Sequence, residues 1–371
     1  MLQNERVYVV DTITGQKMAE LAVTDFSYKR VINGMGPGSA TVRRGDSRNH
    51  GLNVRFYTKP LRYMLVYEAN FKPVYAGIIT RRKYVKATGE LALELKDVWW
   101  ILGKRMAVEH GTNAAAETIL TWSGLSLGTI IKKLIQEAVW PARPWYALPI
   151  VFPADVSGVH SRKYYGYNFA TIADAISDLM ATSGGPNVDF VPSWSGEFLR
   201  LTLRTGSLGG NVWEYNLDAP DPGIYDVAAT EDAESITTNA YSLGEGSEKN
   251  MLVRSHPDLS GSLPAIEKTE SHKDISVATQ LDALAQERIR TQAVPTEQFE
   301  ASIRKDGEPG PNGEQVIGLP TVDQLRLGDT ILTLNDTDEF LPTGATSHQI
   351  IEFSGSMGDP MVTLQFQPTG A

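Results

Sequence analysis

The chain has 371 residues and no cysteine, and its 34 basic and 44 acidic side chains give a formal net charge of −10. The lack of cysteine excludes disulfide frameworks, thiolate zinc sites and cysteine nucleophiles. The negative charge disfavours nucleic-acid binding, because phosphate contacts need clustered Lys and Arg side chains. The sequence also has no window near the roughly 20 apolar residues of a membrane span and no signal-peptide-like start, so a soluble protein without a cleaved signal is expected.

Residues 1–111 are predicted to form a β-barrel-like domain. Turn residues separate six segments that favour strands: Arg6–Val10, Ala19–Tyr28, Ser39–Arg43, Leu61–Glu68, Val74–Val85 and Leu91–Lys96. Six short strands without a long helix are typical of a small barrel or sandwich.

The stretch Val74–Arg105 is the most informative part of this domain. Its leucines alternate with polar residues over Leu91–Leu95, which predicts a strand with one apolar face, and Gly89 suits the turn before it. Trp99 and Trp100 follow. Adjacent residues on a strand face opposite sides, so one tryptophan is expected to fill the barrel and the other to meet another domain or subunit.

Residues 112–227 are predicted to form an α/β module. Apolar residues recur at helical spacing in Leu127–Val139 and Phe169–Thr182, and Ser126 or Thr129 can cap the first helix. Strands are expected at Val188–Pro192, Phe198–Arg204 and Val212–Leu217.

Residues 228–371 are predicted to form a second β-barrel-like domain with one helix at Ile275–Thr291. Its expected strands are Ser235–Leu243, Asn250–His256, Phe299–Arg304, Thr330–Leu334, His348–Ser354 and Met361–Phe366. Long polar loops are expected at His256–Lys273 and Lys305–Ile317. The predicted fold class is therefore mixed β and α+β, with two barrel-like domains flanking a central α/β module.

One motif resembles that of an enzyme. Gly124–Gly128 matches the G-x-S-x-G nucleophile elbow around Ser126, and a predicted helix follows it. A serine hydrolase acting on cell walls or esters is therefore one alternative. The α/β-hydrolase fold needs repeated βαβ units, which this chain lacks, so helix capping is the preferred interpretation.

No metal, cofactor or catalytic site is predicted. The six histidines include no i, i+4 pair. Asp306, Glu308, Asn312 and Glu314 resemble calcium ligands, but their order departs from an EF-hand loop. The acidic run from Asp218 to Glu234 is interpreted as a charged linker, and the glycines of Gly34–Gly38 as a β-turn.

The basic and tryptophan-rich clusters are the predicted interaction sites. The candidates are Arg43 and Arg44, then Arg81, Arg82 and Lys83, then Trp99, Trp100, Lys104 and Arg105. The arginine clusters suit an acidic partner or inter-subunit ion pairs, although a solvated strand face explains them equally well. A second alternative function is glycan binding by an aromatic cluster made of Trp140, Trp145, Tyr146, Tyr164, Tyr165 and Tyr167.

Three segments resemble minor tail proteins of long-tailed siphophages of actinobacterial hosts, the baseplate-hub or tail-hub class. The first runs from Val74 to Arg105, with Y-A-G-I-I, T-G-E-L-x-L-x-L-x-D and W-W-I-L-x-x-R. The second is S-Y-K-R-V-I-N-G-M-G-P-G-S-A-T-V, starting at Ser27, and the third is L-R-L-G-D-T-I-L-T-L at Leu325–Leu334. The long polar loops have no counterpart in this family pattern.

The resemblance implies a structural protein of the virion, assembled in the host cytoplasm, and not an enzyme. Such hubs have two barrel domains with inserted α/β domains, and three copies form a ring at the tail tip. The implied partners are the distal tail protein, the tape measure protein and tip or receptor-binding proteins. DNA is expected to pass through the ring without specific binding, helped by like charge on the channel wall.

Overall fold

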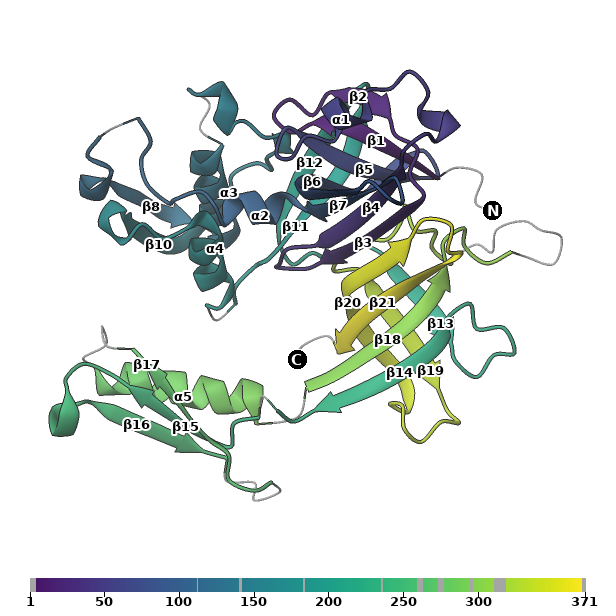
Figure 1. Ribbon diagram of the computed structural model, residues 1–371. Coiled ribbons are helices and arrows are strands. Elements are labelled where there is room, and N and C mark those ends of the chain that lie inside the picture. Colours follow the sequence, from purple (N-terminus) through teal and green to yellow (C-terminus); the bar gives the residue numbers. More distant parts are fainter. Residues whose placement is uncertain are drawn as a thin grey trace.

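A computed structural model describes residues 5–111, 113–139, 142–182, 184–234, 236–258, 263–272, 277–293, 296–309 and 318–368. Figure 1 shows two adjoining β regions, a helical region beside the N-terminal strands, and a small region that extends from the C-terminal strands. The predicted mixture of β and α+β structure is confirmed. Within these residues, no helix has both the length and the apolar character needed to cross a membrane.

The N-terminal part of the large sheet has the spatial order β3-β4-β7-β6-β5-β1-β2. Its strands are β1 (Glu5–Asp11), β2 (Lys17–Glu20), β3 (Asp25–Val31), β4 (Pro37–Arg43), β5 (Tyr63–Ala69), β6 (Lys72–Val85) and β7 (Glu90–Lys96). The prediction of one strand over Ala19–Tyr28 is wrong. Leu21 still donates its N–H to a carbonyl of β1, whereas Thr24 donates to Thr41 in β4, so the chain turns a corner between two partner strands.

The C-terminal part of the sheet contains β13 (Val212–Asn216), β14 (Tyr225–Asp232), β18 (Thr296–Arg304), β19 (Thr330–Asn335), β20 (Gly344–Ser356) and β21 (Met361–Pro368). The first half of β20 pairs with β19, and its second half pairs with β3. One long strand therefore joins both parts. The path through the described strands ends at β14 and at β2, so the two predicted barrels are not found as closed barrels.

One hydrophobic core runs through both parts of this sheet. Alternation along the strands produces it: in β21, Val362, Leu364 and Phe366 are buried while the residues between them are partly exposed. In the N-terminal part, the Phe26 ring stacks on Tyr67 with 5.4 Å between the centroids. The two β regions are thus packed as one body.

The helical region contains α2 (Val98–Leu102), β8 (Ile119–Leu125), α3 (Leu127–Ala138), β9 (Ile150–Val151), β10 (Ser157–Tyr165), α4 (Ile172–Met180), β11 (Asn187–Ser195) and β12 (Phe198–Gly206). Both predicted helices are confirmed, and their apolar faces share one core. Thr171 caps α4 by accepting the N–H of Asp174 at 3.1 Å. This helix starts later than predicted because Phe169 has a left-handed backbone with φ 46°.

An inserted region, residues 239–292, lies between β14 and β18 in the chain. It contains β15 (Asn239–Leu243), β16 (Val253–Pro257), β17 (Glu267–Ser271) and α5 (Ala278–Gln292). Ala240, Ala285 and Ile289 form its small core. The prediction of a polar loop over His256–Lys273 is corrected by β17. Parts of both predicted loops lie outside the described residues, namely 259–262 and 273 in the first loop and 310–317 in the second. Ile275, the predicted first residue of the helix, also lies outside them.

Ion pairs to buried carboxylates connect segments that are distant in the sequence. Lys305 Nζ lies 2.9 Å from Glu5 Oε1, and Arg30 in β3 lies 2.6 Å from Asp189 in β11. Lys72 and Asn70, on both sides of the β5–β6 turn, donate to Asp323. These contacts hold the N-terminal strands against the rest of the body.

Candidate functional site

A groove lies where β4 and β6 end and β7 begins. Leu93 pairs with Arg82, and Leu91 pairs with both Tyr84 and Val42, so these side chains share one face of the sheet. Leu93 is buried in the core, whereas Tyr84 is 46% exposed. Arg82 and Tyr84 therefore lie on the same face of the sheet as the core residues, beyond the buried part of the strands.

This basic groove has a volume of about 840 Å³, within the usual range of binding pockets. Four of its lining residues are arginines: Arg43, Arg44, Arg55 and Arg82. Its apolar lining comprises Val42, Leu52, Val54 and Leu91. Helix α1 (Val54–Tyr57), which is capped by Asn53, carries Arg55 to the rim. The groove thus combines positive charge with an apolar floor.

Two of the groove arginines bond to neutral oxygen atoms. Arg44 Nη1 lies 3.4 Å from Tyr84 Oη, and Arg82 Nη1 donates to the Arg55 carbonyl at 2.8 Å. The groove carboxylate Asp46 is held by Arg48 at 2.7 Å, which keeps the pKa of Asp46 below its usual value. Within the described part of the chain, no carboxylate pairs with any of the four arginines. A chain of net charge −10 therefore carries a concave positive site.

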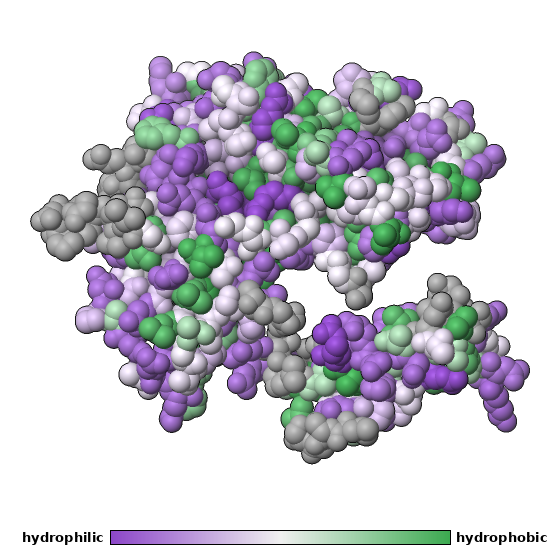
Figure 2. Space-filling model, turned by 180° about the vertical axis from the view of Figure 1, so that it is seen from behind, coloured by the Kyte–Doolittle hydropathy of each residue, from purple (hydrophilic) through white to green (hydrophobic). Residues whose placement is uncertain are grey.

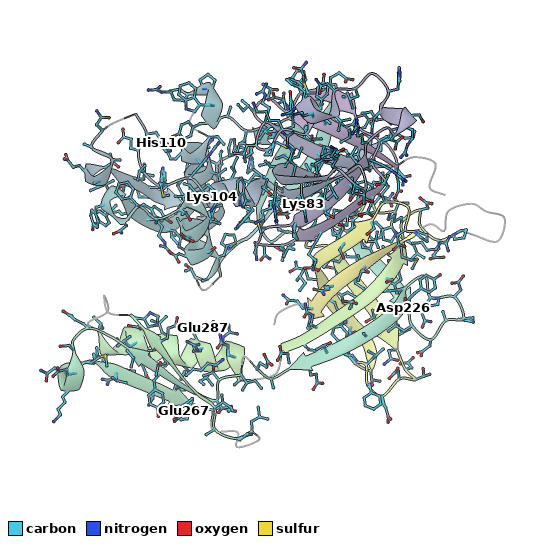
Figure 3. All side chains as sticks on the ribbon, in the orientation of Figure 1. Lys83, Lys104, His110, Asp226, Glu267 and Glu287 are labelled. Atoms are coloured by element: carbon cyan, nitrogen blue, oxygen red, sulfur yellow. The ribbon has the colours of Figure 1, made fainter. Side chains whose placement is uncertain are left out.

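The sequence indicates this site only in part. It named Arg43, Arg44 and Arg82, but as two separate clusters. It missed Arg55, because a lone arginine between turn residues carries no pattern. The other members of the second cluster lie away from the groove lining: Arg81 pairs with Glu94 at 2.8 Å, and Lys83 is exposed on the same strand (Figure 3).

The two tryptophans lie on a short helix, and their assignment to a strand is wrong. Asp97 caps α2 by accepting the N–H of Trp99 at 3.0 Å, so the apolar run Val98–Leu102 folds into one helical turn. Trp99 is 9% exposed and packs with α3 and α4, not inside the N-terminal sheet. Its ring meets Phe190 edge to face at 6.4 Å. Trp100 is half-buried.

Arg105 and Lys104 have different surroundings. Arg105 Nη1 donates to the carbonyls of Ala138 and Tyr146, both at 2.6 Å, and burial lowers its pKa. Arg105 therefore ties the end of α3 to the following loop. Lys104 is exposed, and Figure 3 shows it in the helical region, apart from Lys83. Among these residues, Lys104 and Trp100 retain surface that another molecule can reach.

Asp97 carries a pH-dependent part of the stability. Its Oδ2 accepts the N–H of Gly36 at 2.7 Å, and burial raises its pKa to about 7, above the roughly 3.9 of a solvated aspartate. A raised acid pKa means that this stability is complete below about pH 4 and is lost as the pH rises through about 7. Asp97→Asn is expected to reduce the loss of unfolding free energy between pH 5 and pH 8, measured by urea titration. The exposed control Asp359→Asn should behave as the wild type, and equal pH dependence in all three proteins would contradict the assignment.

Ser126 has the geometry of a helix cap. Its Oγ accepts the N–H of Thr129 at 3.2 Å and lies 3.0 Å from Thr129 Oγ1. Its backbone is extended, with φ −69° and ψ 154°, whereas an elbow nucleophile sits on a strained turn. Within the described residues, no histidine nitrogen makes a hydrogen bond to this hydroxyl.

The Ser126→Ala variant tests both interpretations. Loss of the cap is expected to lower the unfolding free energy by about 0.5–2 kcal/mol, measured by chemical denaturation. Hydrolysis of a model ester should be the same with wild type, variant and buffer. A wild-type turnover that the variant lacks would support the hydrolase alternative.

The predicted aromatic cluster does not form one binding platform. Trp140 lies outside the described residues. Tyr164 packs on Trp122 at 6.0 Å, Tyr146 on His110 at 4.9 Å, and Tyr165 stacks on Tyr167 at 5.3 Å. Trp145 is 61% exposed and lies beside Arg143. These aromatic side chains are thus divided among several local contacts.

The described acidic residues form no cluster of metal ligands. Within the described residues, no group of three or more His, Asp or Glu side chains could hold a metal ion. Asn312 and Glu314 of the calcium-like run lie outside those residues. The predicted acidic linker is corrected in part: Asp226, Glu231 and Asp232 lie on β14, an edge strand of the large sheet (Figure 3).

Sequence reasoning also missed an acidic loop, residues 336–340, between β19 and β20. It contains Asp336, Asp338 and Glu339 and ends at Phe340, whose side chain is 84% exposed. Figure 2 shows small, dispersed apolar groups on the face it displays, so single exposed rings are not unusual here. The signal that could have found this loop is the run D-T-D-E-F between two strands.

Known structures share this fold along nearly the whole chain. A tail protein from Neisseria meningitidis MC58 is 14% identical, with a TM-score of 0.58 over 99% of this chain and 97% of that one. The 43 kDa tail protein of prophage MuSo2 from Shewanella oneidensis is 9% identical, with a TM-score of 0.59 over 98% of each chain. A chain of the Francisella PdpA–VgrG complex has 7% identity and a TM-score of 0.50, over 99% of this chain and 53% of that one. The fold is therefore one that phage tail proteins have.

No family model matches the sequence, and no curated protein matches it.

Proposed function

We propose that this protein is a structural component of the virion, the tail hub at the tip of a long non-contractile phage tail. Three copies form a ring that joins the tail tube and distal tail protein to the tip and receptor-binding proteins. The tape measure protein ends against this ring, and DNA leaves through its lumen. The protein is assembled into the tail in the host cytoplasm.

The likeness to tail proteins along the whole chain carries this proposal, because it covers 99% of this chain and 97% of the Neisseria protein. The sequence resemblance to siphophage hubs adds the tail type and the copy number. The net charge of −10 supports a conduit, since a like-charged wall repels DNA. The cap geometry of Ser126 favours a structural role over hydrolysis.

Light scattering and negative-stain imaging of the purified protein at high concentration test the proposal. The expected result is a particle with three times the chain mass and a ring with a central hole. A strictly monomeric protein that forms no ring, alone or with the other tail proteins, would contradict it.

A further inference from the structure

We propose that the basic groove of one copy receives the acidic loop of a second copy. This inference rests on the proposed ring and names the contact that builds it. The groove offers four arginines that have no carboxylate partner within the described residues, over an apolar floor. The acidic loop offers the complementary set on the same chain, carboxylates around one exposed aromatic ring.

The acidic loop is held in shape before any contact forms. Asn335 is 1% exposed, and its Nδ2 donates to the carbonyls of Asp338 and Leu341 at 2.8 and 3.1 Å. Asp338 Oδ1 accepts the N–H of Phe340 at 2.9 Å. A loop with a fixed conformation loses little entropy on binding, which suits it to a docking role.

Among the described residues, no basic side chain neutralises the negative charge of the acidic loop. Asp218, at the end of β13, accepts the N–H of Asp336 at 2.7 Å and the hydroxyl of Thr337, and these bonds lower the pKa of Asp218. Within the described residues, no Lys or Arg pairs with Asp218 or with the three loop carboxylates. Four carboxylates thus correspond to four guanidinium groups, and carboxylates are the partners that arginine binds best.

Phe340 supplies the apolar part of the contact. A phenyl ring that is 84% exposed gains free energy when an apolar floor covers it, and buried aromatic anchors dominate many interfaces. The groove volume of about 840 Å³ accommodates such a ring together with neighbouring backbone. The groove arginines are poorly suited to nucleic-acid binding, because the negative net charge of the chain repels polyanions.

The loop cannot reach the groove of its own chain. The acidic loop precedes the first residue of β20. The last residues of β20 pair with β3 and run toward the end of β4, which is where the groove lies. Thirteen strand residues span roughly 40 Å. Figure 1 likewise places the turn from β19 to β20 and helix α1 at opposite ends of the β body. Contact between these two different surfaces is head-to-tail, and such contacts close into rings when the rotation permits.

Cysteine cross-linking of the full-length chain tests the contact. The natural chain has no cysteine, so the pair Ser47→Cys and Glu339→Cys, at the groove rim and in the loop, can form a disulfide only between copies. Oxidation should give dimers and then a closed trimer on a non-reducing gel. The control pair Ser47→Cys and Phe71→Cys, with Phe71 63% exposed on the β5–β6 turn, should remain monomeric on that gel.

Charge reversal tests the chemistry of the contact. Arg44→Glu/Arg55→Glu should weaken self-association at least about tenfold in sedimentation, as should Phe340→Ala, whereas Phe71→Ala should not. Adding Asp338→Lys/Glu339→Lys to the groove variant should restore much of the association, since the charges are then exchanged. Circular dichroism of each variant should show the wild-type spectrum, as the control for folding.

The outcomes separate this inference from the proposed function. The wild type can form rings while the cysteine pair gives no cross-link and the exchanged charges restore no association. That result would overturn the proposed contact and leave the proposed hub function standing. A groove variant that self-associates normally but loses another tail protein or DNA would assign the groove to that partner and overturn the inference. If the wild type stays monomeric without a ring, and the Ser47→Cys/Glu339→Cys variant gives no cross-link, both proposals are overturned.

Discussion

Lys305→Met is expected to lower the unfolding free energy by about 3–5 kcal/mol, because it leaves a buried carboxylate without its cation. Lys305 is 1% exposed, and the Glu5 side chain is 5% exposed. The ammonium also donates to the Ser356 carbonyl, and Glu5 additionally accepts the Tyr67 hydroxyl and the N–H of Gly358. One ion pair thus fastens the first strand to the C-terminal part of the sheet.

Urea titration followed by tryptophan fluorescence measures this loss. The double variant Glu5→Gln/Lys305→Met removes both charges and should recover part of the stability. Arg81→Met, which breaks an exposed pair with Glu94, is the matched control and should leave the midpoint unchanged. An equal effect of Lys305→Met and Arg81→Met would show that the buried pair does not hold the two parts together.

Trp99→Ala is expected to lower the unfolding free energy by about 3–5 kcal/mol, the usual cost of removing a large buried side chain. Trp99 lies in the core shared by α2, α3 and α4 and meets Phe190 from β11. The cavity would open within this core of the helical region. Denaturation followed by far-ultraviolet circular dichroism measures the loss without relying on the deleted fluorophore.

Trp100→Ala is the matched control, since Trp100 is the adjacent residue and is only half-buried. It should cost much less stability. If Trp99→Ala left stability unchanged and weakened self-association instead, Trp99 would belong to an intermolecular interface. The sequence left these two roles open, and the burial of Trp99 favours the role in the fold.

Helices and strands were predictable where the residues of one segment alone show the apolar pattern. The helices α3 and α4 have apolar faces at helical spacing, α3 also has a predicted cap at its start, and both helices form. Most strands of the large sheet were also found, because alternation is a local pattern. The prediction failed at Ala19–Tyr28 and at the two tryptophans. A strand that changes partners and a five-residue helix started by Asp97 depend on contacts beyond the segment.

The candidate site was predictable only as separate pieces. Arg43, Arg44 and Arg82 were identifiable as basic residues, but the pairing of β7 with both β4 and β6 is what places them around one groove. Arg55 joins them through α1, which sequence patterns did not indicate. The exposure of Phe340 was not predictable either, because an exposed aromatic side chain cannot be told from a buried one without the fold.

Taken alone, the amino-acid sequence describes an acidic protein without cysteine, rich in strands, with three amphipathic helices and no convincing catalytic set. These properties depend on composition and on spacing within one segment. The folded chain is needed to show that β20 joins both β regions, that Trp99 is buried among helices, and that four arginines line one groove while the acidic loop lies far from it. Such facts depend on which distant segments pair and pack, and that is settled by the free energy of the whole fold.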